Sequence, residues 1–130
     1  MEIMVGYDDS RVAKDALDVA IRHAQAFDAR VHLVTSMMSG SDVPKKEFDR
    51  VEKKLEYAES LFKDKKIPCK THLLVRGLEP GEDLVQFAKE FNIDEIVIGI
   101  KRRSKVGKLL AGSTAQYVIL QATCSVLTIK

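Results

Sequence analysis

The sequence predicts an α/β fold in which a parallel sheet of five strands carries helices on both faces. Five short apolar runs alternate along the chain with four longer segments, whose apolar residues recur at steps of three and four. The short runs are nearly continuous in apolar character, as in strands that are buried on both faces. Because a helix returns the chain after each strand, we expect right-handed crossovers between parallel strands.

The first half of the chain provides two strands and two helices. Strands are expected at residues 3–6 and 31–35, and Ser10 or Asp9 is expected to cap the helix between them. The inward face of that helix carries Ala13, Ala16, Leu17, Ala20, Ile21, Ala24 and Phe27. Pro44 marks the entry to a second helix. Its inward residues are Phe48, Val51, Leu55, Ala58 and Phe62.

The second half repeats this alternation and adds a closing strand. A strand is expected at residues 71–75, an acidic segment at 79–83 begins the third helix, and a β-branched strand follows at 95–99. Ser113 is expected to open a fourth helix, and the last strand falls at 125–129. The inward residues expected for the last two helices are Leu84, Ala88 and Phe91, then Ala115, Ile119 and Ala122.

Size and charge narrow the class of protein. The 130 residues fall in the usual range of one domain, so we expect a single domain over residues 1–130. Lys and Arg number 21 against 19 Asp and Glu, a net charge of +2, which is too balanced for a surface devoted to nucleic acid or an anionic membrane. The apolar runs are too short to span a bilayer, and the first residues do not form a signal peptide. These features indicate a cytoplasmic protein.

The cysteines and histidines do not suggest a metal or a disulfide. Cys69 and Cys124 are far apart and in no CxxC arrangement, so they are expected to be reduced thiols packed in or near strands. His23, His32 and His72 are scattered, and no pair stands at a metal-ligand spacing. We therefore assign no metal site from the sequence.

Functional residues are expected where the strands end, because ligands of open α/β sheets bind outside the carboxyl ends of the strands, where the strand order reverses. Residues 6–10 read GYDDS and lack the GxGxxG of a dinucleotide-binding turn. Gly107-Lys108 matches only part of the P-loop pattern GxxxxGK(S/T). Arg102 stands where that pattern needs its first glycine, and Leu109 stands where it needs Ser or Thr. These two nucleotide-binding motifs are excluded.

Paired carboxylates follow the first strand. Asp8 and Asp9 would suit the Mg²⁺ site of a phosphoacceptor receiver domain. That chemistry also needs a carboxylate at the end of the third strand, where this chain has Val75-Arg76-Gly77. A receiver domain is disfavoured, and Asp8 needs another role.

The segment after the fourth strand has the composition of a phosphate site. Gly99 ends the strand, five cations follow between residues 101 and 108, and Gly112-Ser113-Thr114 opens a helix. Helix N-termini hold anions through unpaired N–H groups and the positive end of the helix dipole. Two other interpretations stay open at this point. Residues 113–116 (STAQ) also form a capping box, and a run of cations is often only a solvated loop.

Four segments of the chain, taken in order, resemble the universal stress protein family. They are the opening V-G-Y-D-D-S at residues 5–10, the V-R-G-L-E-P segment at 75–80, the spacing of Gly99 from Gly112-Ser113, and the ending C-S-V-L-T-I at 124–129. The resemblance covers essentially the whole chain. It implies an open sheet of strand order 3-2-1-4-5, Rossmann-like and of the adenine nucleotide alpha hydrolase-like type.

The resemblance also implies a ligand and a partner. The ligand would be ATP or another adenine nucleotide, with or without Mg²⁺. The residues near the adenine and ribose would be Tyr7, Asp8, Asp9 and Ser36, and those at the ribose and phosphates would be Gly99, Gly112, Ser113 and Thr114. The partner would be a second copy, paired through Val126, Leu127, Thr128 and Ile129. Pairing would also cover the edge of the sheet at this short apolar strand.

One residue departs from the family pattern. Arg102 stands where the family's second glycine is expected. If the backbone there needs positive φ, arginine costs about 1 kcal/mol. Alternatively, Arg102 supplies charge-assisted hydrogen bonds that replace a backbone contact, together with Lys101, Arg103, Lys105 or Lys108.

The sequence favours a binding protein over an enzyme. It shows no Ser/His/Asp grouping and no base beside the phosphate segment, so ATP hydrolysis, if any, is expected to be slow. The other function considered is a stress-signalling adaptor that needs no nucleotide and contacts a protein partner through residues 101–108. Nucleic-acid binding by the same segment is disfavoured because aromatic residues are not interleaved with its cations.

Overall fold

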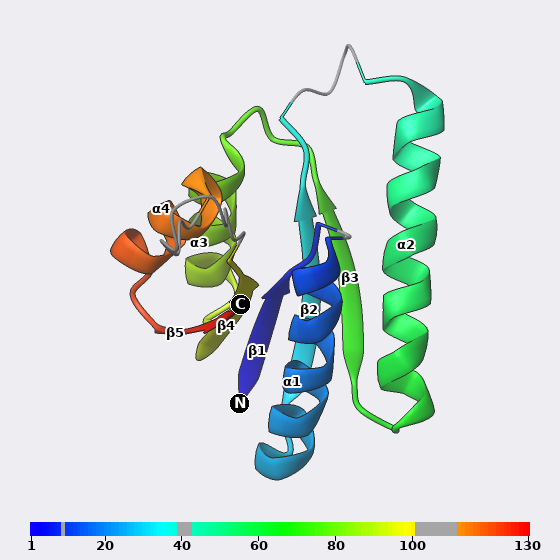
Figure 1. Cartoon of the computed structure of the whole chain (residues 1–130), viewed down its shortest axis with the longest axis vertical. Helices are drawn as coiled ribbons and strands as arrows, with labels where there is room; N and C mark the ends of the chain where they lie inside the picture. The colour runs from blue at the N-terminus through cyan, green and yellow to red at the C-terminus, as the bar shows by residue number, and fades with distance from the viewer. Residues whose placement is uncertain (9, 39–42, 101–111) are drawn as a thin grey trace.

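The described part of the chain, in a computed structural model, comprises residues 1–8, 10–38, 43–100 and 112–130. Within these ranges strands and helices alternate, as the periodicity predicted (Figure 1). The elements are β1 (Glu2–Gly6), α1 (Arg11–Phe27), β2 (Arg30–Ser36), α2 (Lys45–Asp64), β3 (Cys69–Leu74), α3 (Pro80–Glu90), β4 (Glu95–Gly99), α4 (Ser113–Gln121) and β5 (Ser125–Ile129).

The strands form one parallel sheet in the order β3-β2-β1-β4-β5, which confirms the predicted order. β1 lies at the centre, where Val5 pairs with Leu33 of β2 on one side and with Val97 of β4 on the other. The chain moves outward from β1 to β2 and β3 and then returns to the other side of β1 for β4. The strand order therefore reverses between the neighbouring strands β1 and β4, which is where an open α/β sheet binds its ligand.

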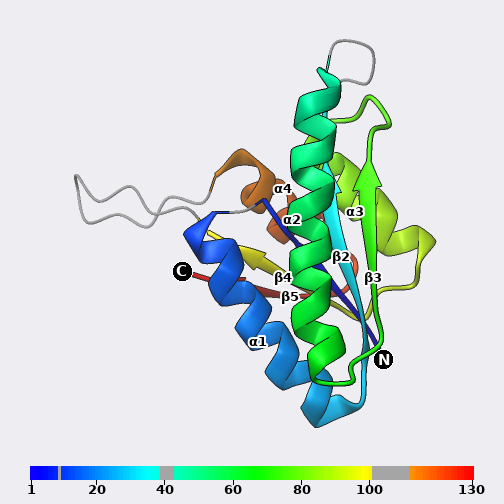
Figure 2. The same ribbon diagram turned by 90° about the vertical axis from the view of Figure 1, so that its right-hand side faces the viewer.

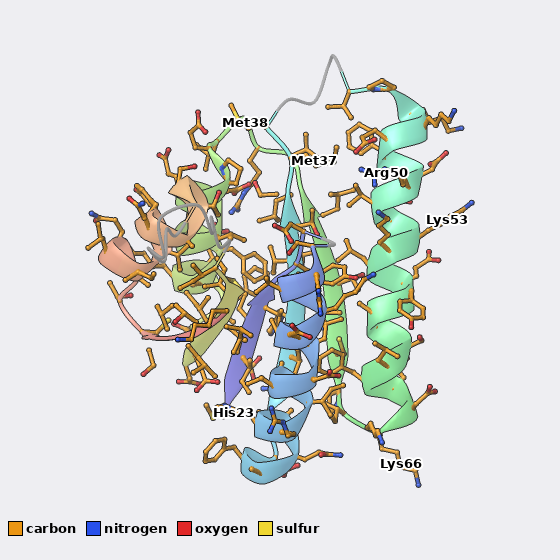
Figure 3. All side chains as sticks on the ribbon, viewed as in Figure 1. His23, Met37, Met38, Arg50, Lys53 and Lys66 are labelled. Atoms are coloured by element: carbon orange, nitrogen blue, oxygen red, sulfur yellow. The ribbon has the colours of Figure 1, made fainter. Side chains whose placement is uncertain are left out.

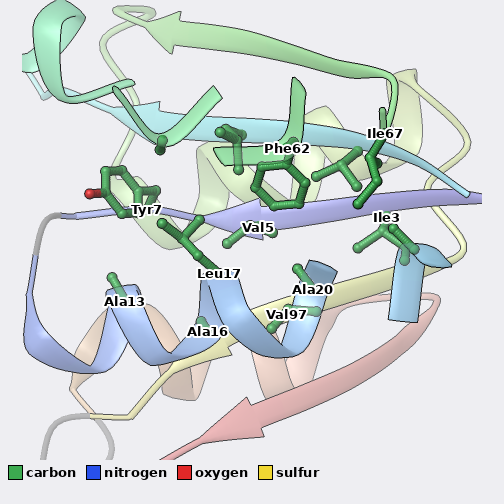
Figure 4. Close-up of a cluster of buried hydrophobic side chains, with 14 of the residues drawn as sticks. Ile3, Val5, Tyr7, Ala13, Ala16, Leu17, Ala20, Phe62, Ile67 and Val97 are labelled. Atoms are coloured by element: carbon green, nitrogen blue, oxygen red, sulfur yellow. The ribbon is translucent and has the colours of Figure 1, made fainter. Parts of the chain in front are cut away.

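Helices cover both faces of this sheet (Figure 2). Alternate residues of β1 point to opposite faces, so Ile3 and Val5 join the core under α1 and α2, while Met4 joins the core under α3 and α4. Figure 4 shows the first core, in which Leu17 of α1 and Phe62 of α2 meet the sheet. Each large apolar side chain that is fully buried here stabilises the fold by about 1.5–3 kcal/mol.

Local capping explains where α1 begins and ends. The Ser10 hydroxyl accepts a hydrogen bond from the backbone N–H of Ala13 at 3.1 Å, so Ser10 is the N-cap. A cap of this kind is worth about 1 kcal/mol. The helix ends at Asp28, whose φ of 53° is left-handed, and Ala29 N–H then bonds the carbonyl of Ala24 at 3.0 Å.

The outer face of α2 is charged. Lys53 projects from this helix away from the sheet, and so does Lys66 just beyond its end (Figure 3). The opposite face carries Leu55, Ala58 and Phe62, which are buried. None of the helices in the described ranges combines the length and the apolarity needed to cross a bilayer.

The apolar stripes were predicted wrongly at several helix ends. Phe27, Phe91 and Ile119 are 57%, 40% and 43% exposed, although each was expected to face inward. The buried residues near them are Phe87 in α3 and Val118 in α4. Helical periodicity identifies a stripe but not how far along the helix that stripe stays in contact with the core.

The third strand also differs slightly from its prediction. It runs over Cys69–Leu74 rather than residues 71–75, because Val31 and Thr35 of β2 pair with Cys69 and Leu73. The bounds of β3 are thus set by its pairing with β2 and not by the apolar run in the sequence. Val75 falls after the strand and begins the turn that leads to Arg76 and α3.

Candidate functional site

A cavity of about 380 Å³ opens at the point where the strand order reverses. Its floor comes from the ends of three neighbouring strands: Gly6 of β1 with residues 7–8 that follow it, residues 34–36 of β2, and Ile98 and Gly99 of β4. Pro80 and Leu84 of α3 form one wall. Residues 112–115, at the start of α4, form another. The cavity therefore combines strand ends with a helix N-terminus.

Most of the residues singled out from the sequence meet in this cavity. Those that line it are Tyr7, Asp8, Ser36, Gly99, Gly112, Ser113 and Thr114. Asp9, Lys101, Arg102 and Arg103 lie outside the described residues.

Several lining residues were missed by the sequence analysis. Val34, Pro80, Leu84 and Ile98 also line the cavity. They are apolar and were assigned only to strands or to a helix, which is their role in the core as well. Their positions at strand ends and in the first turns of α3 were the available signal. They make part of the cavity surface apolar.

Backbone and side-chain bonds extend the contact between β1 and β2 past the strands. Tyr7 N–H donates to the carbonyl of Val34 at 2.9 Å, and the Thr35 hydroxyl donates to the carbonyl of Tyr7 at 2.6 Å. The Tyr7 ring is buried in the core beneath α1 and α2 (Figure 4). Asp8 is exposed, and one of its carboxylate oxygens accepts from the N–H of Ser10 at 3.0 Å. Asp8 is thus held at the mouth of the cavity.

The start of α4 differs from the capping box considered for residues 113–116. Gly112 is the N-cap, Ser113 is the first helical residue, and no side chain caps this helix. The capping-box interpretation is therefore wrong. The helix begins one residue earlier than a Ser113 cap would require, so the Ser113 hydroxyl does not stand at the capping position. The N–H groups of the first turn of α4 thus border the cavity without a capping side chain.

Two glycines set how closely the helices approach the site. A Cβ on Gly99 would lie 2.7 Å from Cγ1 of Val12, so α1 can pass this end of β4 only because residue 99 is glycine. A Cβ on Gly81 would lie 2.8 Å from Cβ of Tyr117 and 3.2 Å from the carbonyl oxygen of Thr114. Gly81 therefore sets the distance between α3 and α4, the two helices that form the walls of the cavity.

Behind Ser36 lies an ionic cluster around one buried carboxylate, which the sequence did not reveal. Asp83 of α3 is 0% exposed, and its two carboxylate oxygens accept from Arg76 Nε at 2.7 Å and from the Ser36 hydroxyl at 2.6 Å. Arg76 also bonds Glu90 at 2.7 Å. Burial of Arg76 opposes its charge, but its hydrogen bonds to Asp83 and Glu90 outweigh this and raise the pKa of its guanidinium. The cluster ties the end of β2 to α3.

Two histidines that are distant in the sequence meet across β2 and β3. His32 Nδ1 lies 3.0 Å from His72 Nε2, and His32 Nε2 lies 2.9 Å from a carboxylate oxygen of Glu2. Phe87 and Phe91 cover the pair. Nothing in the sequence relates these histidines to each other, because only the pairing of β2 with β3 brings them together. Across the described ranges, no group of three His, Cys, Asp or Glu side chains is placed to hold a metal.

Both thiols are free and poorly ionised. Burial, and secondarily the charge of Glu59, raises the pKa of Cys69 to about 12. Burial also raises the pKa of Cys124. A thiol is reactive mainly as thiolate, so neither cysteine is equipped to act as a nucleophile.

Comparisons with known proteins agree with this architecture. The model of the Universal stress protein family matches residues 1–130. A universal stress protein of Thermus aquaticus is 33% identical, over 98% of this chain and 97% of its own length. A solved universal stress protein from Archaeoglobus fulgidus superposes with a TM-score of 0.91 at 37% identity, covering 100% of this chain and 98% of that one.

A second solved structure carries a ligand. It is a universal stress protein from Archaeoglobus fulgidus in complex with dAMP, with a TM-score of 0.86, 34% identity, and coverage of 100% of this chain and 98% of that one. Both neighbours have the adenine nucleotide alpha hydrolase-like fold. Because the family match extends over every residue, this chain belongs to the universal stress protein family.

Proposed function

We propose that this protein binds an adenine nucleotide, ATP or a close relative, and serves as a regulatory module in the stress response. The observation that carries the proposal is the cavity at the strand-order reversal, which opens onto an uncapped helix N-terminus. Such a terminus is suited to a phosphate. The dAMP complex of a relative that is 34% identical over the whole chain supports the same ligand class.

Size and composition of the cavity fit one nucleotide. Its volume of about 380 Å³ falls at the lower end of small-molecule sites. Val34, Leu84 and Ile98 offer apolar contact for a base. Asp8 offers acceptors for a hydroxyl or amino group. The phosphates would reach Gly99 and residues 112–114, and Lys101, Arg102 and Arg103 would add charge there.

A Mg²⁺ ion would enter with a triphosphate. Asp8 is the one carboxylate that lines the cavity within the described residues. Mg²⁺ commonly combines one or two carboxylates with water and substrate phosphates, so Asp8 suits a nucleotide-borne ion and does not form a site by itself. The ion would screen the charge of the phosphates beside the first turn of α4.

We further infer that the nucleotide acts as a signal and is not turned over efficiently. The described lining residues include no histidine, cysteine or lysine, so no such side chain stands beside the Ser113 hydroxyl among them. A nucleophile and a general base within hydrogen-bond reach are the usual equipment of a hydrolase. We expect ATP turnover far below the roughly 10 per second that is common for enzymes.

We also propose a homodimer through the edge strand β5. In the described part of the sheet, β5 pairs only with β4, so its other edge is available for a second copy. Val126, Leu127 and Ile129 are half-buried, and Thr128 is exposed. Pairing would remove the unpaired edge that otherwise invites aggregation.

The test is a calorimetric titration of the nucleotide-free protein with ATP and Mg²⁺. We expect a dissociation constant in the micromolar range. Gly112→Val should weaken binding at least about tenfold, because branched carbons would then stand where the phosphates meet the helix N-terminus. Gln121→Ala, at the far end of the same helix, is the matched control and should bind as the wild-type protein does.

Absence of ATP binding would favour the other function considered for this protein. No heat of binding up to about 1 mM ATP, a free energy weaker than about −4 kcal/mol, would contradict the nucleotide proposal. The adaptor function through residues 101–108 would then be the one to pursue. Circular dichroism of each variant separates a lost site from a lost fold.

A further inference from the structure

The buried carboxylate behind the cavity has a consequence for ligand selection. Asp83 is the charged side chain with the least exposure among the described residues, at 0%. A buried carboxylate is tolerated only when it is paired and hydrogen-bonded. Arg76 Nε donates to one of its oxygens at 2.7 Å, and Arg76 Nη2 donates to the backbone carbonyl of Asp83 at 3.2 Å. These bonds fix the orientation of the carboxylate.

The second oxygen of Asp83 fixes the Ser36 hydroxyl. Ser36 Oγ lies 2.6 Å from it. A carboxylate accepts and cannot donate, so the single hydroxyl proton of Ser36 is committed to Asp83. Ser36 also lines the cavity. What it presents there is therefore its remaining lone pairs.

The neighbouring hydroxyl is committed in the same way. Thr35 Oγ1 donates to the carbonyl of Tyr7 at 2.6 Å and also lines the cavity. Neither hydroxyl at the end of β2 therefore has a proton left to donate to a ligand. The start of α4, on the other side of the cavity, presents backbone N–H donors. The cavity has an accepting end and a donating end.

The two ends are separated by about the length of a nucleoside. β1 lies between β2 and β4, so Ser36 and Gly99 stand about two strand spacings, roughly 10 Å, apart. An anion at the α4 end places the ribose next to it and the base at the β2 end. A base that carries an N–H donor on its edge can donate to the lone pairs of Ser36 Oγ. A base with a carbonyl at that place would set its oxygen, which is also an acceptor, against Ser36 Oγ.

We propose that Asp83, held by Arg76, is a positioning residue that keeps Ser36 a hydrogen-bond acceptor and so makes the cavity select 6-amino purines over 6-oxo purines. This inference rests on the proposed nucleotide binding. Asp83 acts through Ser36 and does not itself line the cavity. A polar site rejects an analogue of the wrong hydrogen-bond polarity strongly, because buried groups are then left unpaired.

Asp83→Asn tests this by reversing one hydrogen bond at nearly constant volume. Arg76 still needs an acceptor, so the new amide oxygen turns to Arg76 and the amide N–H turns to Ser36. The Ser36 hydroxyl then accepts from the amide and directs its own proton into the cavity. AMP and IMP are the probes. We expect wild-type protein to prefer AMP by at least about tenfold, and Asp83→Asn to bring the ratio near one or invert it.

Further variants isolate the effect. Ser36→Ala removes the accepting group and should also abolish the AMP-to-IMP preference, which keeps the inference testable should Asp83→Asn fail to fold. Glu90→Gln is the matched control, since Glu90 is 44% exposed and contacts Arg76 without touching Ser36. It should leave the ratio at its wild-type value. Loss of packing alone would weaken AMP and IMP together and would not move their ratio.

The outcomes separate this inference from the proposal on which it rests. If wild-type protein binds neither AMP nor IMP, the nucleotide proposal fails and the inference falls with it. If both bind and the ratio is the same in Asp83→Asn and Ser36→Ala as in the wild type, only the inference is overturned. If Ser36→Ala instead changes the ratio of AMP to dAMP, Ser36 contacts the ribose, and its assignment to the base is overturned.

Discussion

Gly99 and Gly77 are glycines for different physical reasons. Gly99 is surrounded, since an added Cβ would approach Cγ1 of Val12 at 2.7 Å. Gly77 has open space around it, but its φ of +72° is left-handed. The first position excludes a side chain by packing, and the second disfavours one by backbone strain. The sequence analysis assigned Gly99 to the ligand, because nothing in a linear pattern shows that α1 packs against it.

Gly99→Ala is therefore expected to lower the free energy of unfolding by about 1–3 kcal/mol, the usual cost of overpacking. Val12→Ala should restore part of this loss in the double variant, because it removes the Cγ1 atom that the new methyl group meets. Urea denaturation of the two single variants and the double variant measures the coupling. Gly77→Ala is the contrasting control, expected to cost about 1 kcal/mol and to gain nothing from Val12→Ala. Strictly additive effects at Gly99 and Val12 would contradict this explanation.

The candidate site was predictable in part at this scale. Gly112-Ser113-Thr114 and Asp8 have types and positions that suit a nucleotide, and they line the cavity. Asp83 could not be found in this way. A carboxylate in the first turn of a helix is ordinarily a solvated residue that favours the helix dipole. Its burial depends on Ser36 and Arg76, which reach it from β2 and from the turn after β3.

Among the elements, the paired strands β1, β2 and β3 create a titratable cluster at one face of the sheet. Burial, the charge of His32 and the charge of Lys70, in that order, lower the pKa of His72 from its ordinary value of 6.5. For Glu2, burial opposes ionisation, but hydrogen bonds from His32 and Arg30 outweigh it and lower its pKa. The bond between the two imidazoles needs one nitrogen without a proton, so protonating both rings breaks it.

This cluster predicts a fall in stability on acidification. Because the pKa of His72 is lower in the folded protein, the unfolded chain binds its proton more readily, and stability is complete above about pH 6.5 and declines as the pH falls below it. Glu2 contributes a separate loss only below its ordinary value of 4.5. Urea denaturation at pH 7.5 and pH 5.0 should show this loss in the wild type and a smaller one in His72→Gln. Equal losses in both proteins would exclude His72 as the source.

The order and type of the elements followed from the sequence, but their inward faces did so only in part. The stripe of α2 was correct at Leu55, Ala58 and Phe62. In α4, by contrast, Ile119 is 43% exposed and Val118 is fully buried. A nine-residue helix gives too few turns to determine a face, so the contact with α3 through Gly81 determines it. Longer helices were predictable because more of their residues contribute to the pattern.

At the scale of the whole molecule, the strand order predicts the position of the cavity better than any sequence motif does. Parallel strands end at one edge of the sheet, and the order β3-β2-β1-β4-β5 brings the ends of β1, β2 and β4 together. The alternation of strands and helices was enough to predict a ligand site at those strand ends. The polarity of the cavity was not predictable, since it depends on which partner receives the protons of Thr35 and Ser36.

The proposed dimer is a property of the whole molecule, and it can be tested by removing one backbone N–H group from the outer edge of β5. The carbonyl of Ile129 accepts from Ile100 N–H of the preceding segment at 2.7 Å, so the polar backbone groups of Ile129 face β4. Backbone N–H and C=O groups alternate sides along a strand, so those of Thr128 face the outer edge of β5. Thr128→Pro would remove a donor from the outer edge and leave the bonds to β4 in place.

Sedimentation at micromolar concentration should show the wild-type protein at twice its monomer mass of 14.6 kDa and Thr128→Pro as a monomer. Thr128→Val has a similar shape and keeps the N–H, so it should remain dimeric. If Val126, Leu127 and Ile129 instead associate only through their side chains, both variants will behave alike, and the edge-pairing geometry is wrong. A wild-type protein that is monomeric at this concentration would remove the dimer itself. Edge strands without a partner favour uncontrolled pairing, so that monomer would need another element to cover β5.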